Sequence, residues 1–151
     1  MTAKEYLNRL KKLDKLIENK LAEREQWYAM ATSTTAAYAP ETGVRVQTSG
    51  SKQQMANAMD KYIDIGKQID SLIDKLYDER KQIIGVIEEL ETTEYDVLHK
   101  MYVGVVKDER RYYMDFNEIA ILYDKSYSWA TWIHGIALKN VQRIIDNCKQ
   151  L

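Results

Sequence analysis

Cysteine, proline and long apolar runs are scarce in this sequence, and each shortage excludes a class of protein. The single cysteine, Cys148, rules out a disulfide within the chain and fits a reducing compartment. One proline and six glycines disfavour a turn-rich β-sandwich and permit long helices. No run approaches the roughly 18 apolar residues of a transmembrane helix, and the N-terminus lacks a signal-peptide core. We expect an all-α, cytoplasmic protein without a membrane partner.

An excess of charge of one sign is also absent. The formal net charge is -1, so the whole chain lacks the basic surplus that often accompanies nucleic-acid binding. From residue 100 to the end, eight Lys or Arg face six Asp or Glu, which leaves a local net charge of +2. Any DNA-binding activity must therefore rest on a local surface.

Two stretches have the apolar spacing of amphipathic helices. Residues 3 to 31 place apolar side chains three or four positions apart, and a heptad-like register runs from Met55 to Leu90. Between them, residues 32 to 51 hold the only proline and many Ser and Thr, and the periodicity disappears. This pattern predicts a long antiparallel, coiled-coil-like helical hairpin over residues 1 to 91, with a loop at 32 to 51.

The second of these helices carries more apolar residues than one neighbour would cover. Ile65, Leu72 and Val86 widen its stripe beyond a two-stranded seam. A second copy of the chain would cover the extra surface and make a homodimer. The alternative is that the C-terminal part of the same chain covers it.

Residues 92 to 151 change to a pattern of several short helices. Thr92 or Thr93 is placed to cap the first of them. A segment rich in charges and aromatic residues follows at 104 to 115. We interpret the whole region as a small helix-turn-helix domain.

The helix-turn-helix prediction rests on two capping signals and a tight turn. Asp115 with Glu118 three residues later has the spacing of a capping box, which predicts a helix beginning near Phe116. The letters "YDKS" then form a turn, and Ser126 is placed to cap a second helix over residues 127 to about 147. In such motifs the N-terminal part of the second helix enters the major groove of DNA.

The candidate DNA-binding residues lie at the start of that second helix and around it. The outward positions offer side chains that contact base edges or phosphates: Tyr127, Ser128, Trp129, Thr131 and Trp132. Four basic residues are candidates for phosphate contacts: Arg110, Arg111, Lys125 and Lys139. For Trp129 and Trp132, contact with the groove, a partner surface and packing within the chain all remain open.

Catalytic and metal-binding patterns are not visible. His99 and His134 have no cysteine or carboxylate cluster at a metal-ligand spacing. A DNA-facing role or a structural hydrogen bond are the two interpretations of His134. Phosphate-binding loops and nucleophile motifs are also missing. We expect neither an enzyme nor a cofactor.

Several motifs resemble known bacterial and phage proteins. "EIAILYDKSYSWATWIHGIALKNV" resembles the helix-turn-helix of region four of bacterial sigma factors, through the matching residues Glu118, Ile119, Ala120, Ser126, Ile133, Ala137 and Leu138. Together with "EYLNRLKKLDKLIENKL", "VQTSGS" and "VIEELETTEYDVLHKMYV", it is similar to the phage-encoded ArpU-like and RinA-like late-gene transcription regulators. The stretch between the first helix of this region and "FNEIA" is longer than the short glycine-containing link in these relatives, and its extra residues include Asp108 to Tyr113.

The resemblance implies a regulator of phage or prophage genes in a bacterial host, with promoter DNA as its partner. We expect a homodimer that reads double-stranded DNA with two sigma-like domains or engages RNA polymerase at a promoter. Two other hypotheses remain: a small terminase-like DNA-packaging protein, and an adaptor that binds bacterial RNA polymerase.

Overall fold

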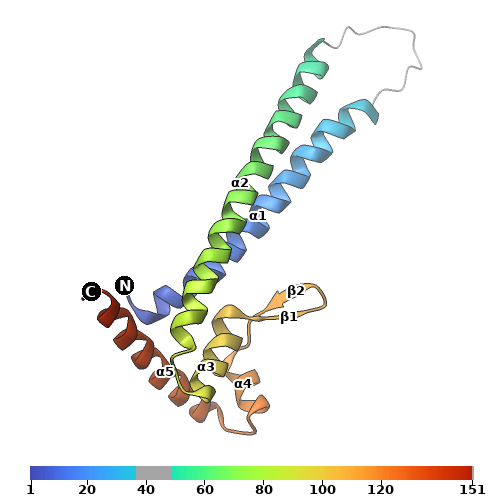
Figure 1. The fold of residues 1–151 in the computed structure, drawn as a ribbon. Helices are drawn as coiled ribbons and strands as arrows, with labels where there is room; N and C mark the ends of the chain where they lie inside the picture. Colours follow the sequence, from blue (N-terminus) through green and yellow to red (C-terminus); the bar gives the residue numbers. More distant parts are fainter. Residues whose placement is uncertain (37–48, 151) are drawn as a thin grey trace. The chain divides into compact units, whose positions relative to one another are not determined.

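A computed structural model describes residues 1–36 and 49–150 of the chain. The helices are α1 (Ala3–Ala36), α2 (Ser49–Ile87), α3 (Thr92–Leu98), the π-helical turn η1 (His99–Val103), α4 (Phe116–Leu122) and α5 (Tyr127–Cys148) (Figure 1). They confirm the predicted all-α class. A short antiparallel hairpin of β1 (Val105–Lys107) and β2 (Arg110–Tyr112) was not predicted.

The two long helices extend further into the expected loop than the periodicity predicted. α1 continues to Ala36 and α2 begins at Ser49, so the loop prediction of 32 to 51 is wrong at both ends. Residues 37–48 of that loop lie outside the described residues. The hydroxyl of Thr32 donates a hydrogen bond to the carbonyl of Tyr28, 2.9 Å away, so a threonine here is compatible with the helix. At its other end α2 stops at Ile87, before the predicted residue 91.

Contacts divide the chain into two compact units. The base unit comprises Met1–Leu13 with Leu76–Leu151, and the arm unit comprises Asp14–Lys75. The start of α1 and the end of α2 therefore share a unit with α3, α4 and α5. The boundary predicted between residues 91 and 92 does not coincide with this division.

The base unit has a core built from both ends of the chain. Its largest fully buried side chains are Leu7, Leu10, Ile83, Ile87, Val97, Leu98, Ile119 and Val141. Val86, one of the extra apolar positions of α2, packs against this core. In the base unit, the chain itself thus covers part of the apolar surface that a second copy was expected to cover.

The arm unit is an antiparallel pair formed by the remaining lengths of α1 and α2, as predicted. Lys20 Nζ donates to Gln68 Oε1 at 3.1 Å, and Arg24 Nη2 donates to the Tyr62 hydroxyl at 2.8 Å. A residue later in α1 bonds to a residue earlier in α2, so the two helices run antiparallel. Ala31, Ala58, Ile65 and Ile69 are the buried hydrophobic residues of this pair.

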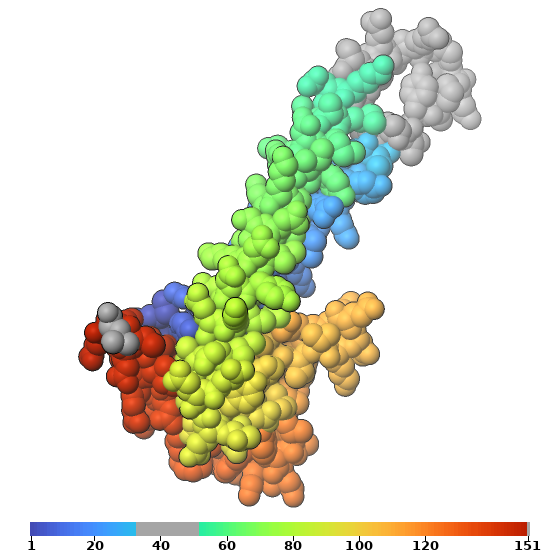
Figure 2. All heavy atoms as spheres, in the orientation of Figure 1, coloured from blue at the N-terminus to red at the C-terminus, as the bar shows by residue number. Residues whose placement is uncertain are grey.

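The β1–β2 hairpin projects from the base unit (Figure 2). Val105 pairs with Tyr112 and Lys107 with Arg110, so Asp108 and Glu109 alone form the turn, both with positive φ (52° and 64°). Two positive φ angles match a type I′ turn, which usually contains Asn or Gly. Because Asp and Glu occupy these positions instead, the sequence carries no signal for this turn.

Candidate nucleic-acid interface

The first helix of the motif begins where the sequence predicted. Asp115 is the N-cap of α4, and its carboxylate accepts a hydrogen bond from the Glu118 backbone N–H at 2.9 Å. Interaction with the nearby Glu118 carboxylate raises the pKa of the exposed Tyr112 hydroxyl on strand β2. Thr92 and Thr93, in contrast, do not cap α3: its N-cap is Glu91, without a side-chain hydrogen bond, and both threonines lie inside the helix.

The turn between α4 and α5 is fixed by backbone hydrogen bonds. Asp124 has a left-handed φ of 52°, and its N–H donates to the carbonyl of Ile121 at 3.2 Å. The N–H of Lys125 donates to the carbonyl of Ala120 at 2.9 Å. These two bonds define a Schellman motif, which ends a helix sharply. Ser126 follows at once as the N-cap of α5.

Ser126 is expected to contribute measurably to stability. Its hydroxyl oxygen accepts a hydrogen bond from the backbone N–H of Trp129 at 3.1 Å. Replacing Ser126 with alanine removes this cap and is expected to lower the free energy of unfolding by about 1 kcal/mol. Ser128→Ala, in the exposed first turn of α5, is the matched control. This change is expected to alter the free energy of unfolding by less than about 0.5 kcal/mol. Urea denaturation measures both; equal effects would contradict the capping role.

The inner face of α5 is apolar and packs against other helices of the base unit. Ala130, Ile133, Ala137, Val141 and Ile145 are buried, and α5 packs against both α3 and α4. Because this face is used for packing, only the opposite side of α5 is free to meet a partner.

The two tryptophans occupy different environments. Trp129 is half-buried against the core of the base unit, and its ring lies 5.2 Å from the ring of Tyr123 at the end of α4. Packing within the chain therefore accounts for Trp129. Trp132 is 61% exposed and points away from the core. Of the two tryptophans, only Trp132 is therefore a strong candidate for contact with a partner.

The remaining predicted positions on α5 form an exposed stripe. Ser128, Trp132 and Lys139 lie four and seven residues apart, so they follow one side of the helix, and Ser128 and Lys139 are exposed. Tyr127 is exposed at the first turn. Thr131 is half-buried and its hydroxyl donates to the carbonyl of Ser128 at 2.9 Å. We call Ser128, Trp132 and Lys139 the α5 stripe.

The four basic candidates occupy different environments. Lys125 lies exposed in the turn that leads into α5, and Arg110 lies exposed at the tip of the β hairpin. Arg111 is half-buried, and its Nη1 donates to the carbonyl of Val103 at 2.7 Å. This bond satisfies a carbonyl at the end of η1, so the structure gives Arg111 a structural role that the sequence did not predict.

Sequence analysis missed two exposed apolar residues at the end of α4. Ile121 is 80% exposed and Leu122 is 50% exposed. Ile119 and Ala120 are the buried residues of α4, and a rotation of about 100° per residue carries Ile121 away from that face. Exposed apolar side chains of this size often mark contact with a partner.

His134 has a structural role. It is buried, and its Nε2 lies 2.7 Å from the hydroxyl of Tyr102 in η1. Burial lowers the pKa of His134, and the charges of Lys4 and Lys11 lower it further. Burial also raises the pKa of Tyr102 to about 12. The pair is therefore neutral at physiological pH, which resolves the two interpretations of His134 in favour of a structural hydrogen bond.

A second polar cluster ties α3 to the turn of the motif. Asp96 on α3 accepts hydrogen bonds from the Tyr123 hydroxyl and from Lys100. Burial opposes ionisation of Asp96, but these bonds outweigh it and hold its pKa below the usual value. Because Tyr123 also packs on Trp129, this cluster helps fix the angle at which α5 leaves the turn.

Metal sites and membrane spans are not found in the described part of the chain. Residues 1–36 and 49–150 contain no group of three or more histidine, cysteine or acidic side chains arranged to hold a metal ion. Among the described helices, none has the length and apolar character needed to cross a membrane. Neither a protein-family model, nor a curated protein, nor a solved structure matches the chain.

Proposed function

We propose that this chain binds double-stranded DNA through α5 and regulates transcription, with late genes of a phage or prophage in a bacterial cytoplasm as its target. The observation that carries the proposal is the α4–α5 corner. A Schellman turn and the Ser126 cap fix it, and α5 leaves the stripe Ser128–Trp132–Lys139 exposed. The resemblance to sigma region four points to the same helix. Neighbouring half-sites would be read by a homodimer.

Each side chain of the proposed interface has a defined task. The α5 stripe enters the major groove, where the indole of Trp132 contacts apolar groups such as a thymine methyl and the Ser128 hydroxyl meets a base edge. Lys125 and Lys139 neutralise phosphates and set the register of the helix. Trp129 stays in the core and keeps α5 in place.

The test is selective retention of the protein on DNA fragments tiled across its own genomic neighbourhood. Wild-type protein is expected to prefer one fragment, and Trp132→Ala is expected to weaken that preference about tenfold, within the range of one lost base contact. Val106→Ala removes an exposed apolar side chain of the β hairpin and serves as the control, with retention unchanged. Equal retention of all fragments by wild type and Trp132→Ala would contradict the proposal.

A second candidate function is supported by the apolar end of α4. Ile121 and Leu122 lie exposed beside the turn, and such side chains suit a protein surface better than DNA. An adaptor that binds bacterial RNA polymerase would use them. Ile121→Ser with Leu122→Ser is then expected to abolish polymerase capture while DNA retention persists. Unchanged capture by this variant would exclude the adaptor function for this surface.

A further inference from the structure

One side of the arm unit carries a line of apolar residues that its own helices leave exposed. Leu21 and Tyr28 are seven residues apart on α1, and Met59, Gly66 and Ile73 are spaced by seven on α2. Residues seven apart lie on nearly the same side of a helix, so each set forms a straight stripe. Apart from Gly66, which is half-buried, all are exposed. We call these five residues the apolar flank.

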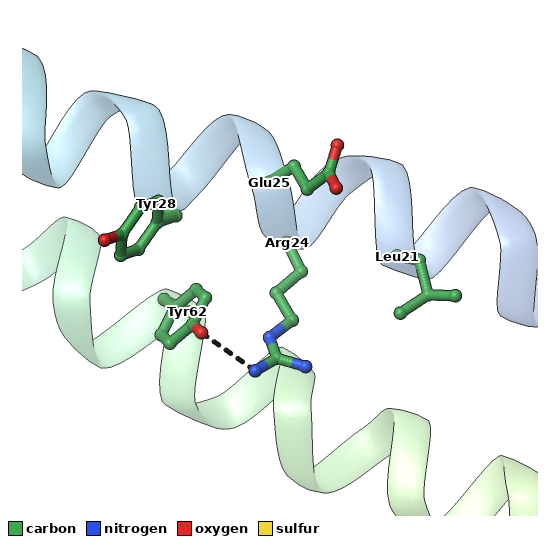
Figure 3. Close-up of a pocket in the computed structure, with 5 residues that line it drawn as sticks. All are labelled: Leu21, Arg24, Glu25, Tyr28 and Tyr62. Carbon is green, nitrogen blue, oxygen red and sulfur yellow. Dashed lines mark hydrogen bonds between the residues drawn. The ribbon is translucent and has the colours of Figure 1, made fainter.

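Contacts within the arm place both stripes on the same side. The rings of Tyr28 and Tyr62 lie 5.4 Å apart, and a Cβ on Gly66 would lie 4.0 Å from the guanidinium of Arg24. A hollow of about 230 Å³ lies there, lined by Leu21, Arg24, Glu25 and Tyr28 of α1 and by Tyr62 of α2 (Figure 3).

The opposite flank of the arm carries charged and polar side chains beside the exposed Leu16 and Met30. Lys20 Nζ is bonded to Gln68 there and lies 3.8 Å from the carboxylate of Glu23. Leu16 lies about 140° around α1 from Leu21, because five residues at about 100° each separate them.

We infer that a second copy of this chain packs on the apolar flank, so that two arms form an antiparallel four-helix bundle. The flank, together with exposed Ile63 one turn from Met59, offers on the order of 400 Å² of apolar side-chain surface per copy. A stable interface buries about 800 Å² per partner, so these side chains supply about half and a polar rim the rest.

The flank is complementary to itself. Leu21 protrudes from α1 at the level where Gly66 leaves α2 without a side chain, opposite Arg24. With the two-fold axis along the arm, α1 of one copy lies against α2 of the other, and all neighbouring helices run antiparallel. Leu21 of each copy then fills the space over Gly66 of its partner. Such a dimer presents two α5 helices, one for each of two DNA half-sites. This role of the dimer rests on the proposed function.

Sedimentation equilibrium of the full chain without DNA tests the inference. Wild type is expected at twice the chain mass at micromolar concentration, and Leu21→Glu at the single mass, because the variant buries a carboxylate in an apolar interface. Leu16→Glu is the matched control: it changes the same residue type at almost the same exposure, 42% against 44%, and is expected to stay dimeric. A monomeric wild type, a ring-sized assembly, or equal masses for the two variants would overturn the inference.

Cysteine cross-linking tests the arrangement without depending on a destabilising variant. In a Cys148→Ser background, Leu21→Cys and Gly66→Cys proteins are expected to join into a disulfide-linked dimer only when mixed under oxidising conditions, because the bond needs Cα atoms about 4.4–6.8 Å apart. Self-linking of Leu21→Cys, or no linking in the mixture, would overturn this packing. DNA retention is measured in a separate experiment. A dimer that fails to bind DNA would contradict the proposed function, whereas a monomer that binds DNA would contradict the packing inferred here.

Discussion

Gly104→Ala is expected to lower the free energy of unfolding by about 3 kcal/mol, near the upper end of what a single substitution costs. Gly104 follows η1 with φ 85° and ψ 168°, a conformation that is essentially restricted to glycine. A Cβ there would lie 2.9 Å from the carbonyl oxygen of Tyr112, a backbone atom that cannot move aside without breaking the β hairpin. The backbone strain and the steric conflict of the alanine side chain therefore both contribute to the loss of stability.

Gly85→Ala is the control for this prediction. Gly85 lies in α2, and a Cβ at this position meets no atom within 4 Å. Alanine is favoured over glycine in a helix, so this variant is expected to gain up to about 1 kcal/mol. Urea denaturation followed by helical circular dichroism compares the two. Equal midpoints for Gly104→Ala and Gly85→Ala would show that the turn after η1 does not constrain the fold.

Tyr102→Phe is expected to cost about 1–3 kcal/mol, because it leaves His134 Nε2 buried without its hydrogen-bond partner. Tyr95→Phe, which removes a hydroxyl from a half-buried tyrosine of α3, is a suitable comparison and should cost less. Denaturation midpoints measure the difference. A loss for Tyr102→Phe no larger than that for Tyr95→Phe would contradict the role of the pair.

The same pair predicts how stability changes with pH. The pKa of His134 is lowered in the folded chain, so below about pH 6.5 the unfolded chain binds the proton more readily. Stability is therefore full above pH 6.5 and is lost as the pH falls toward the lowered pKa. His99, whose pKa is also lowered by burial and by Lys100, adds to the slope. His134→Gln is expected to make the slope between pH 7.5 and 5 shallower; an unchanged slope would exclude His134 as its source.

The parts of the fold that sequence predicted are those with local causes. Asp115 and Ser126 cap helices through bonds to residues three positions away, and such spacing is visible in the letters. The heptad register of α2 likewise depends only on spacing. Thr92 failed as a cap because Glu91 occupies that position, and helix ends are commonly displaced by one or two residues.

The missed features depend on contacts between distant residues. Trp129 and Trp132 are three positions apart in one helix, and packing against Tyr123 and the core makes the first half-buried while the second stays exposed. The sequence suggests a surface charge at Arg111, but its guanidinium donates a hydrogen bond to the carbonyl of Val103. The core of the base unit joins residues such as Leu7 and Val141, whose separation in sequence no local pattern bridges.

The salt dependence of DNA affinity tests the central claim most directly. Fluorescence anisotropy on the preferred fragment is measured from low to moderate salt for wild type and Lys139→Gln, with Lys149→Gln as an exposed lysine outside the α5 stripe. We predict that log affinity falls linearly with log salt, and that Lys139→Gln alone lowers the slope by about one. An affinity that does not change with salt, or identical slopes for both lysine variants, would contradict DNA binding through the α5 stripe.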